Sequence, residues 1–107
     1  MTTIIPLSRI EVARIRKLGK RTHLPIADVR MMVEEKASAT KLLVITPKKI
    51  MPNAADRNRA RRITTEAVRI VGNMQSKPVA VVIQLKQPLR ELKTQDMVTL
   101  LTPLFQQ

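Results

Sequence analysis

The chain has 107 residues, the length of one domain, and carries 20 Lys and Arg against 8 Asp and Glu, a formal net charge of +12. Because 44% of the residues are apolar, this charge belongs to a folded body, and such an excess is typical of proteins that bind a polyanion. Cysteine is absent, and no apolar run reaches the roughly 18 residues of a membrane span, which excludes disulfides and a transmembrane helix. We expect one cytoplasmic domain, residues 1–107, without a signal peptide or a membrane partner.

A basic amphipathic helix is predicted to begin at Arg9. Ser8 and Glu11 have the spacing of a capping box, in which each side chain accepts from the other residue's backbone N–H. Apolar residues then recur at three-residue intervals as far as Leu18. Gly19 suits the left-handed conformation in which many helices end, so the helix should stop there.

Three strands and a last helix are predicted from hydrophobic periodicity. Residues 26–34 alternate between apolar and polar positions, which indicates a strand with one core face. Residues 42–46 are apolar on both faces, and we expect them to form a hairpin with the preceding strand. Residues 79–85 (VAVVIQL) read as another buried strand. Thr94 can cap a final helix, which Pro103 should kink or end.

The central helix is the most informative element. Asn53 is a suitable N-cap, Asp56 places negative charge in the first turn, and Gly72 should stop the helix after about Val71. Its apolar residues fall within one third of the circumference. The opposite half carries a basic cluster, with Arg59 at its margin: Arg57, Asn58, Arg61, Arg62 and Arg69.

This basic cluster favours contact with nucleic acid over a merely solvated surface. Solvated helix faces usually mix Glu with Lys so that neighbouring charges attract, whereas Glu66 is the single acid among these arginines. The planar guanidinium also suits phosphate oxygens and stacks on bases. Since Phe105 is the only aromatic residue, recognition should depend on backbone charge and shape rather than on stacking.

The inventory of reactive residues argues against catalysis by the protein itself. There is one histidine, His23, and we interpret it as a surface or core-edge residue with no carboxylate beside it. The single acidic pair, Glu34 and Glu35, is expected to be solvated turn charge. With two glycines and no cysteine, neither a phosphate-binding loop nor a zinc motif can be drawn. We predict no catalytic residues and no metal ligands.

Taken together, these motifs resemble one known family. Lys48 and Lys49, a short spacer, the run Arg57-Asn58-Arg59-x-Arg61-Arg62 and then Glu66 are similar to the signature of the bacterial ribonuclease P protein component. The order of the predicted elements matches as well, so the resemblance covers essentially the whole chain. It implies an α+β fold, a two-layer α/β sandwich in the order αββ(β)αβα, with a left-handed βαβ crossover similar to that of a ribosomal-protein domain.

The resemblance also implies a function. Family members bind the catalytic RNA of ribonuclease P and the 5′ leader of precursor tRNA, and they assist the Mg²⁺-dependent removal of that leader. The chain would thus be the accessory subunit of a ribonucleoprotein endonuclease, with the Mg²⁺ bound to RNA. The implied RNA-binding residues are Lys48, Lys49, Arg57, Asn58, Arg59, Arg61, Arg62 and Arg69.

A cleft for the leader is implied between the first helix and the sheet. Relatives usually carry aromatic residues there, and the counterparts in this sequence are Val12, Arg16 and Arg30. Because charged side chains replace aromatic ones, we expect leader binding to show a weaker base preference than in relatives that carry the aromatics. We also expect leader affinity to depend more steeply on salt concentration.

Two other functions are compatible with the composition. One is a ribosomal or other structural RNA-binding protein without a role in processing. The other is a helix-turn-helix DNA regulator that uses residues 53–71 as its recognition helix. Strands and a proline turn precede this helix where a first helix should lie, which argues against the DNA regulator.

Overall fold

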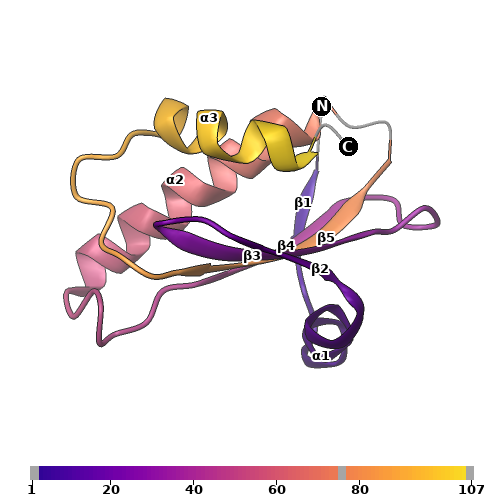
Figure 1. Ribbon diagram of the computed structural model, residues 1–107, viewed down its shortest axis with the longest axis horizontal. Helices are drawn as coiled ribbons and strands as arrows, with labels where there is room; N and C mark the ends of the chain where they lie inside the picture. The colour runs from indigo at the N-terminus through magenta and orange to yellow at the C-terminus, as the bar shows by residue number, and fades with distance from the viewer. Residues whose placement is uncertain (1–2, 75–76, 106–107) are drawn as a thin grey trace.

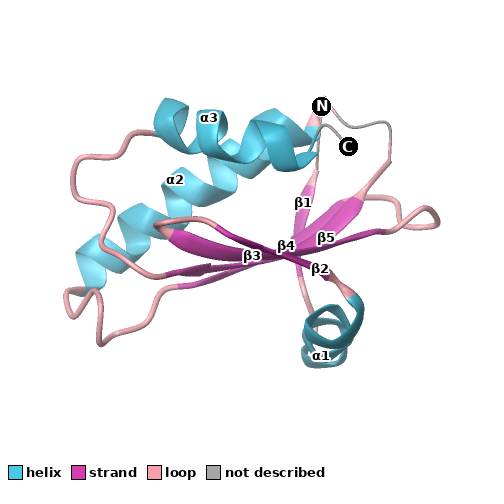
Figure 2. Cartoon of the chain, in the orientation of Figure 1, coloured by secondary structure: helices cyan, strands magenta, loops and turns pink. Residues whose placement is uncertain are grey.

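The computed structural model describes residues 3–74 and 77–105, and within them the chain forms three helices and a mixed five-stranded sheet (Figures 1 and 2). This confirms the predicted α+β class. None of the helices in these ranges is long and apolar enough to cross a bilayer. The elements are, in order, β1 (Ile4–Pro6), α1 (Arg9–Leu18), β2 (Lys20–His23), β3 (Ala27–Val33), β4 (Thr40–Ile45), α2 (Ala54–Gly72), β5 (Val79–Leu85) and α3 (Thr94–Phe105).

The strand order in the sheet is β1-β4-β5-β3-β2. β5 pairs in parallel with β4, to which α2 connects it, and antiparallel with β3. The expected hairpin of β3 with β4 is therefore wrong, because β5 lies between them. Six of the seven residues of β5 are buried. A strand so apolar on both faces is most stable at the centre of a sheet, where neighbours cover both of its edges.

Helices cover both faces of the sheet (Figure 1). α2 and α3 lie on one face, where the main core includes the fully buried Phe105, Ile83 and Leu101. α1 lies on the other face, where Ile15 packs against Ala80 and Val82 of β5. The two expected layers are thus present, and α1 adds a smaller third layer that leaves part of its sheet face open.

The predicted capping box at the start of α1 is confirmed. Ser8 Oγ accepts from the Glu11 backbone N–H at 3.2 Å, and a Glu11 carboxylate oxygen accepts from the Ser8 backbone N–H at 3.0 Å. The expected left-handed Gly19 is wrong, since its φ of −74° is open to any residue. Glycine is required there for space. A Cβ on Gly19 would lie 2.6 Å from the Ile15 carbonyl oxygen and 3.3 Å from that of Met31.

α2 begins as predicted, with the Asn53 side chain accepting from the Ala55 backbone N–H at 2.8 Å. Its buried stripe differs in detail from the expected one, because Thr64 and Val68 are buried and Ile70 is 36% exposed. Pro103 does not end α3, which continues to Phe105.

Candidate nucleic-acid interface

A tight turn presents the lysine pair beside the start of α2. The Pro47 carbonyl oxygen accepts from the backbone N–H of Ile50 at 3.1 Å and from that of Met51 at 3.0 Å. Met51 is only 2% exposed and anchors the turn in the core. Lys48 and Lys49, in contrast, are exposed. The turn therefore holds two cations in solvent next to the positive end of the helix dipole.

Four of the predicted RNA-binding residues are exposed: Lys48, Lys49, Asn58 and Arg62. We call them the open basic surface. Within the described part of the chain, none of their side chains forms a hydrogen bond or an ion pair. Their donors therefore remain available to phosphate oxygens, with no internal contact to break first.

Arg57 and Arg59 have internal partners, which sequence periodicity did not indicate. Arg57, expected on the open half of α2, instead points back to the preceding turn. Its Nη1 donates to the carbonyl oxygens of Met51 at 2.9 Å and Pro52 at 2.8 Å. Arg59 donates to the carbonyl oxygens of Leu89 at 2.5 Å and Leu92 at 2.8 Å. These two arginines fasten the neighbouring loops to α2, and only their remaining N–H groups are free for RNA.

The last two predicted residues lie further along α2. Arg69 forms an ion pair with Glu66, which offsets part of its charge. Arg61 is half-buried, and its Nη1 is enclosed without a hydrogen-bond partner among the described residues. Both line an open groove of about 400 Å³ between α2 and the β1–β4 edge of the sheet, together with Thr65. A buried guanidinium N–H without an acceptor is costly, so this groove favours a phosphate oxygen beside Arg61.

On the opposite side of the sheet, the structure brings together two of the three residues predicted for the leader cleft. Arg30 on β3 donates from Nη1 to the Arg16 carbonyl oxygen at 2.9 Å, which joins β3 to the end of α1. Val12 instead packs beneath α1 in the smaller core. Arg16 and Arg30 are thus placed to meet a ligand, whereas Val12 supports the helix from inside.

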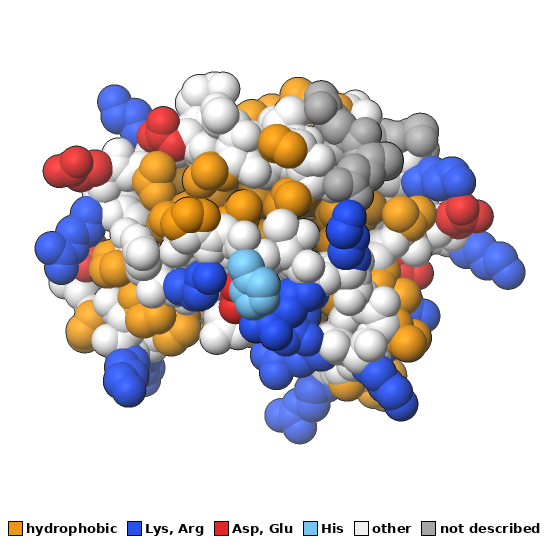
Figure 3. Space-filling view, in the orientation of Figure 1, with side chains coloured by type: hydrophobic (Ala, Val, Ile, Leu, Met, Phe, Trp, Pro, Cys, Tyr) orange, Lys and Arg blue, Asp and Glu red, His pale blue; other side chains and the backbone are white. Residues whose placement is uncertain are grey.

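A charge network that the sequence did not indicate lies on the same sheet face. Asp28 of β3 accepts from His23 Nδ1 at 2.7 Å, Lys86 Nζ at 3.1 Å and Arg21 at 3.4 Å. Figure 3 shows the histidine with lysine and arginine side chains gathered around it. The interpretation of His23 as lacking a neighbouring carboxylate is therefore wrong. β2, which carries His23 and Arg21, was not predicted. Its four residues are all polar, so hydrophobic alternation gave no sign of this strand.

Arg21 extends the basic side of this face, because it lies directly opposite Arg30 in the antiparallel pairing of β2 with β3. Burial raises the pKa of Asp28, but the hydrogen bonds from Lys86, His23 and Arg21 outweigh it and lower the pKa from 3.8 to about 2. The carboxylate therefore stays ionised at neutral pH and holds these cations at one place on the sheet.

The Asp28 network should make stability depend on pH in a narrow acidic range. A carboxyl group with a lowered pKa stabilises the fold fully above its unfolded value of 3.8, and the effect is lost as the pH falls through about 2. Asp28→Asn should therefore lower Tm at pH 5, and the difference from wild type should shrink between about pH 4 and pH 2. Thermal unfolding across this range tests it. A difference that stays constant with pH would show that the charge of Asp28 contributes nothing.

The two acidic residues that follow β3 form ion pairs with basic residues of the same chain. Glu34 forms an ion pair with Arg14, and Glu35 pairs with Lys77 Nζ at 2.7 Å. Among residues 3–74 and 77–105, no three His, Cys, Asp or Glu side chains come together in a way that could hold a metal ion.

This geometry defines a class of protein: a compact α+β domain that presents an arginine-rich helix and a basic sheet face to a polyanion. The family model of ribonuclease P matches residues 8–107. The chain therefore belongs to the ribonuclease P protein component family, whose members take part in tRNA processing and bind RNA.

Solved structures agree with this assignment. The RNase P protein from Thermotoga maritima superposes with a TM-score of 0.74 at 19% identity, over 92% of this chain and 91% of that one. The RNase P protein from Staphylococcus aureus gives 0.72 at 18% identity, over 92% of this chain and 88% of that one. At these identities the likeness concerns the fold. A search of curated proteins finds no match.

Proposed function

We propose that this chain binds the catalytic RNA of ribonuclease P and the 5′ leader of precursor tRNA, and so assists removal of the leader. The observation that carries the proposal is the open basic surface on a chain of this family. The turn before α2 and the first half of this helix expose Lys48, Lys49, Asn58 and Arg62, whose side chains have no partner among the described residues. Cations there reduce the repulsion between two polyanions that must approach each other.

The two RNA contacts would use opposite sides of the sheet. α2 lies on the face that it shares with α3, whereas Arg16, Arg30 and Arg21 belong to the side that carries α1 (Figure 1). A domain built in this way can hold the catalytic RNA on one side and a single strand on the other. Arginine can both neutralise phosphates and stack on bases, which suits an unpaired leader.

The Mg²⁺ implied by the family is proposed to bind RNA and not this protein. The described acidic side chains do not converge on one point, and Asp28, Glu34 and Glu35 already hold cations of the chain. The protein's part is to bind and orient the RNA components and to lower the Mg²⁺ concentration that they need.

Reconstitution tests the proposed function. The protein is mixed with a bacterial ribonuclease P RNA, and cleavage of precursor tRNA is followed at limiting and at saturating Mg²⁺. We expect a rate gain at limiting Mg²⁺ that largely disappears at saturation, because the protein and Mg²⁺ both screen phosphate charge. No gain with the RNA from the same organism would leave a structural RNA-binding role instead.

Leader binding is tested by replacing Arg16 and Arg30 with alanine. Each phosphate contact to a single strand contributes about 0.7 to the slope of log K against log salt concentration, so the slope should fall by about 1.4. Leader affinity is obtained by comparing precursor tRNAs with and without a leader over a salt series. The matched control removes Lys36 and Lys77, which lie after β3 and before β5 and are not among the residues assigned to the leader cleft. Equal slopes for the two variants would refute the leader assignment.

A further inference from the structure

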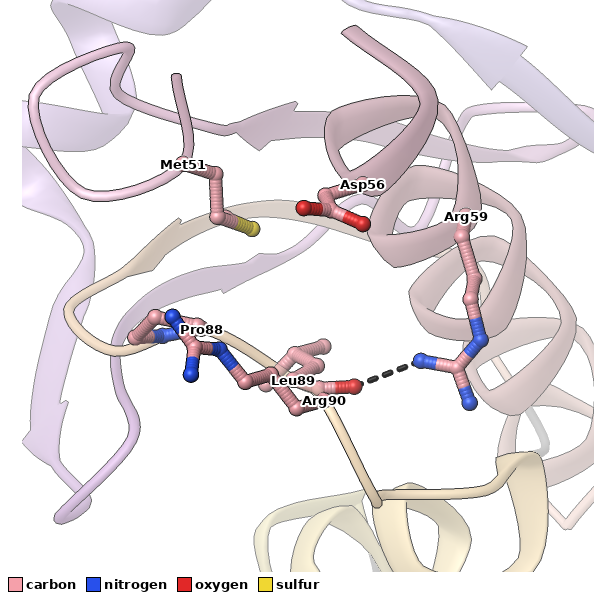
Figure 4. Close-up of a pocket in the computed structure, with 6 residues that line it drawn as sticks. All are labelled: Met51, Asp56, Arg59, Pro88, Leu89 and Arg90. Carbon is pink, nitrogen blue, oxygen red and sulfur yellow. Dashed lines mark hydrogen bonds between the residues drawn. The ribbon is translucent and has the colours of Figure 1, made fainter. Parts of the chain in front are cut away.

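A pocket of about 290 Å³ lies between the first turns of α2 and the segment after β5. Figure 4 shows the residues around it: Met51, Asp56, Arg59, Pro88, Leu89 and Arg90. Its volume is near the lower limit of about 300 Å³ for small-ligand sites, which suits one planar ring system better than a larger group. Of the residues that line this pocket, only Arg59 belongs to the RNA-binding residues named above.

Met51 and Leu89 form two apolar walls of the pocket and are held in place, while Asp56, Arg59 and Arg90 supply its polar lining. Met51 is 2% exposed and Leu89 is 3% exposed, so both walls belong to the core. Arg57 ties the Met51 side to α2 through two carbonyl oxygens, and Arg59 ties the Leu89 side in the same way. The pocket is therefore formed before any ligand arrives, which lowers the ordering cost of binding.

Two charged side chains of the pocket, those of Asp56 and Arg90, have no partner among the described residues. Within the described residues, six of the eight acidic side chains take part in a hydrogen bond or an ion pair, and Asp56 and Glu91 do not. In Figure 4 the Asp56 carboxylate is directed into the space between Met51 and the Leu89 segment. The Asp56 carboxylate is exposed in the first turn of α2, where the helix dipole stabilises negative charge, and it remains available to a ligand. It repels phosphate, so the RNA backbone is not what this group binds.

A ligand that suits a carboxylate in a small pocket with two apolar walls has two adjacent N–H donors on one ring edge. Guanine presents such a pair, N1–H and N2–H, on its Watson–Crick edge. Adenine, cytosine and uracil place an acceptor beside each donor on that edge, so a second carboxylate oxygen would meet a lone pair. The exposed Arg90 has no partner among the described residues, and its planar guanidinium can stack on a base or donate to O6 and N7 of guanine.

We propose that this pocket receives one unstacked guanine base of the partner RNA, with Asp56 accepting from N1–H and N2–H and Arg90 contacting the base from the exposed side. The proposal rests on the proposed function in that it needs an RNA partner. It adds selection of a single base to a surface that otherwise recognises charge and shape. Unpaired bases of folded RNA are available for such contacts, because loops and bulges splay them out.

Titration of the isotope-labelled full chain with nucleoside monophosphates tests the pocket directly. GMP and AMP carry the same phosphate, so their difference reports on the base. We expect saturable NMR shifts of the Asp56, Arg59 and Leu89 backbone amides with GMP, and roughly tenfold weaker binding of AMP. Asp56→Asn, which keeps the shape, should remove the preference. Glu91→Gln, the matched change at the other unpaired acid, should leave it intact.

Three outcomes would overturn the proposal. The first is equal binding of GMP and AMP by the wild-type chain. The second is a set of shifts confined to Lys48, Lys49 and Arg62, which would indicate phosphate binding alone. The third is saturable binding of arginine amide at Asp56 without a preference for GMP, which would assign the carboxylate to a protein partner. Reconstitution keeps the two proposals separate, since GMP selectivity without a rate gain would refute the processing role and leave the pocket standing.

Discussion

Replacing Lys48, Lys49 and Arg62 together by alanine is expected to weaken binding of ribonuclease P RNA roughly 100-fold near physiological salt and to lower the salt slope by about 2 to 3. These residues carry the exposed cations of the open basic surface, and their replacement removes no hydrogen bond or ion pair to the described part of the chain. Each phosphate contact releases counterions, contributing about 0.7 to 0.9 to the slope. The measurement is a filter-binding or fluorescence titration over a salt series.

The control for this experiment is the triple replacement of Arg14, Lys36 and Lys77, which changes the net charge by the same amount. Arg14 and Lys77 pair with the acids at the end of β3, far from the start of α2. If the two triple variants lose equal affinity, the RNA responds to net charge and not to the position of the open basic surface. Cleavage that survives at high Mg²⁺ is expected in both variants, because neither removes a group needed for the chemistry.

Arg59→Ala is expected to destabilise the fold by about 2 kcal/mol, or roughly 10 °C in Tm for a domain of this size. The substitution removes the donors of two charge-assisted hydrogen bonds and leaves the carbonyl oxygens of Leu89 and Leu92 without them. Arg62→Ala lies three residues along the same helix, and Arg62 has no partner within residues 3–74 and 77–105, so this change should alter stability by no more than about 0.5 kcal/mol. Chemical denaturation of both variants measures the difference.

The comparison of Arg59 with Arg62 separates stability from RNA recognition within one motif. RNA affinity is measured well below the unfolding midpoint of either variant, so that loss of folded protein does not appear as loss of binding. Equal free energies of unfolding for the two variants would mean that water replaces the Arg59 hydrogen bonds without loss of stability. In that case the loop after β5 would not depend on α2 for its position.

Local signals of the sequence predicted the starts of α1 and α2 well, whereas Thr94, which was expected to cap the last helix, is itself the first residue of α3. Ser8 and Asn53 both cap as expected, because capping depends on residues within three positions of each other. β1 and β2 were missed, since strands of three and four residues carry too little periodicity. The hairpin was wrong for another reason. The sequence contains no local sign that β5 inserts between two strands that precede it.

The sequence indicated which residues of α2 form the candidate site, but it indicated only some of their orientations and contacts. Helical periodicity indicated which arginines share α2, and it placed Arg62 correctly on the open side. It could not indicate that Arg59 bonds to carbonyls of residues 30 and 33 positions away. Likewise, Asp28 and Lys86 meet only because β3 and β5 are neighbours in the sheet.

The central position of β5 has a consequence for the order in which the molecule can be made. β3 pairs with β2 and β4 pairs with β1, but the two pairs cannot join into one sheet until residues 79–85 arrive between them. During synthesis, the arginines of α2 leave the ribosome before the strand that completes the sheet beneath their helix. A nascent chain ending before Val79 would therefore display a basic segment without a folded platform. RNA that bound this nascent chain would contact basic side chains that the sheet does not yet hold in position. The last quarter of the chain completes the sheet and fixes them.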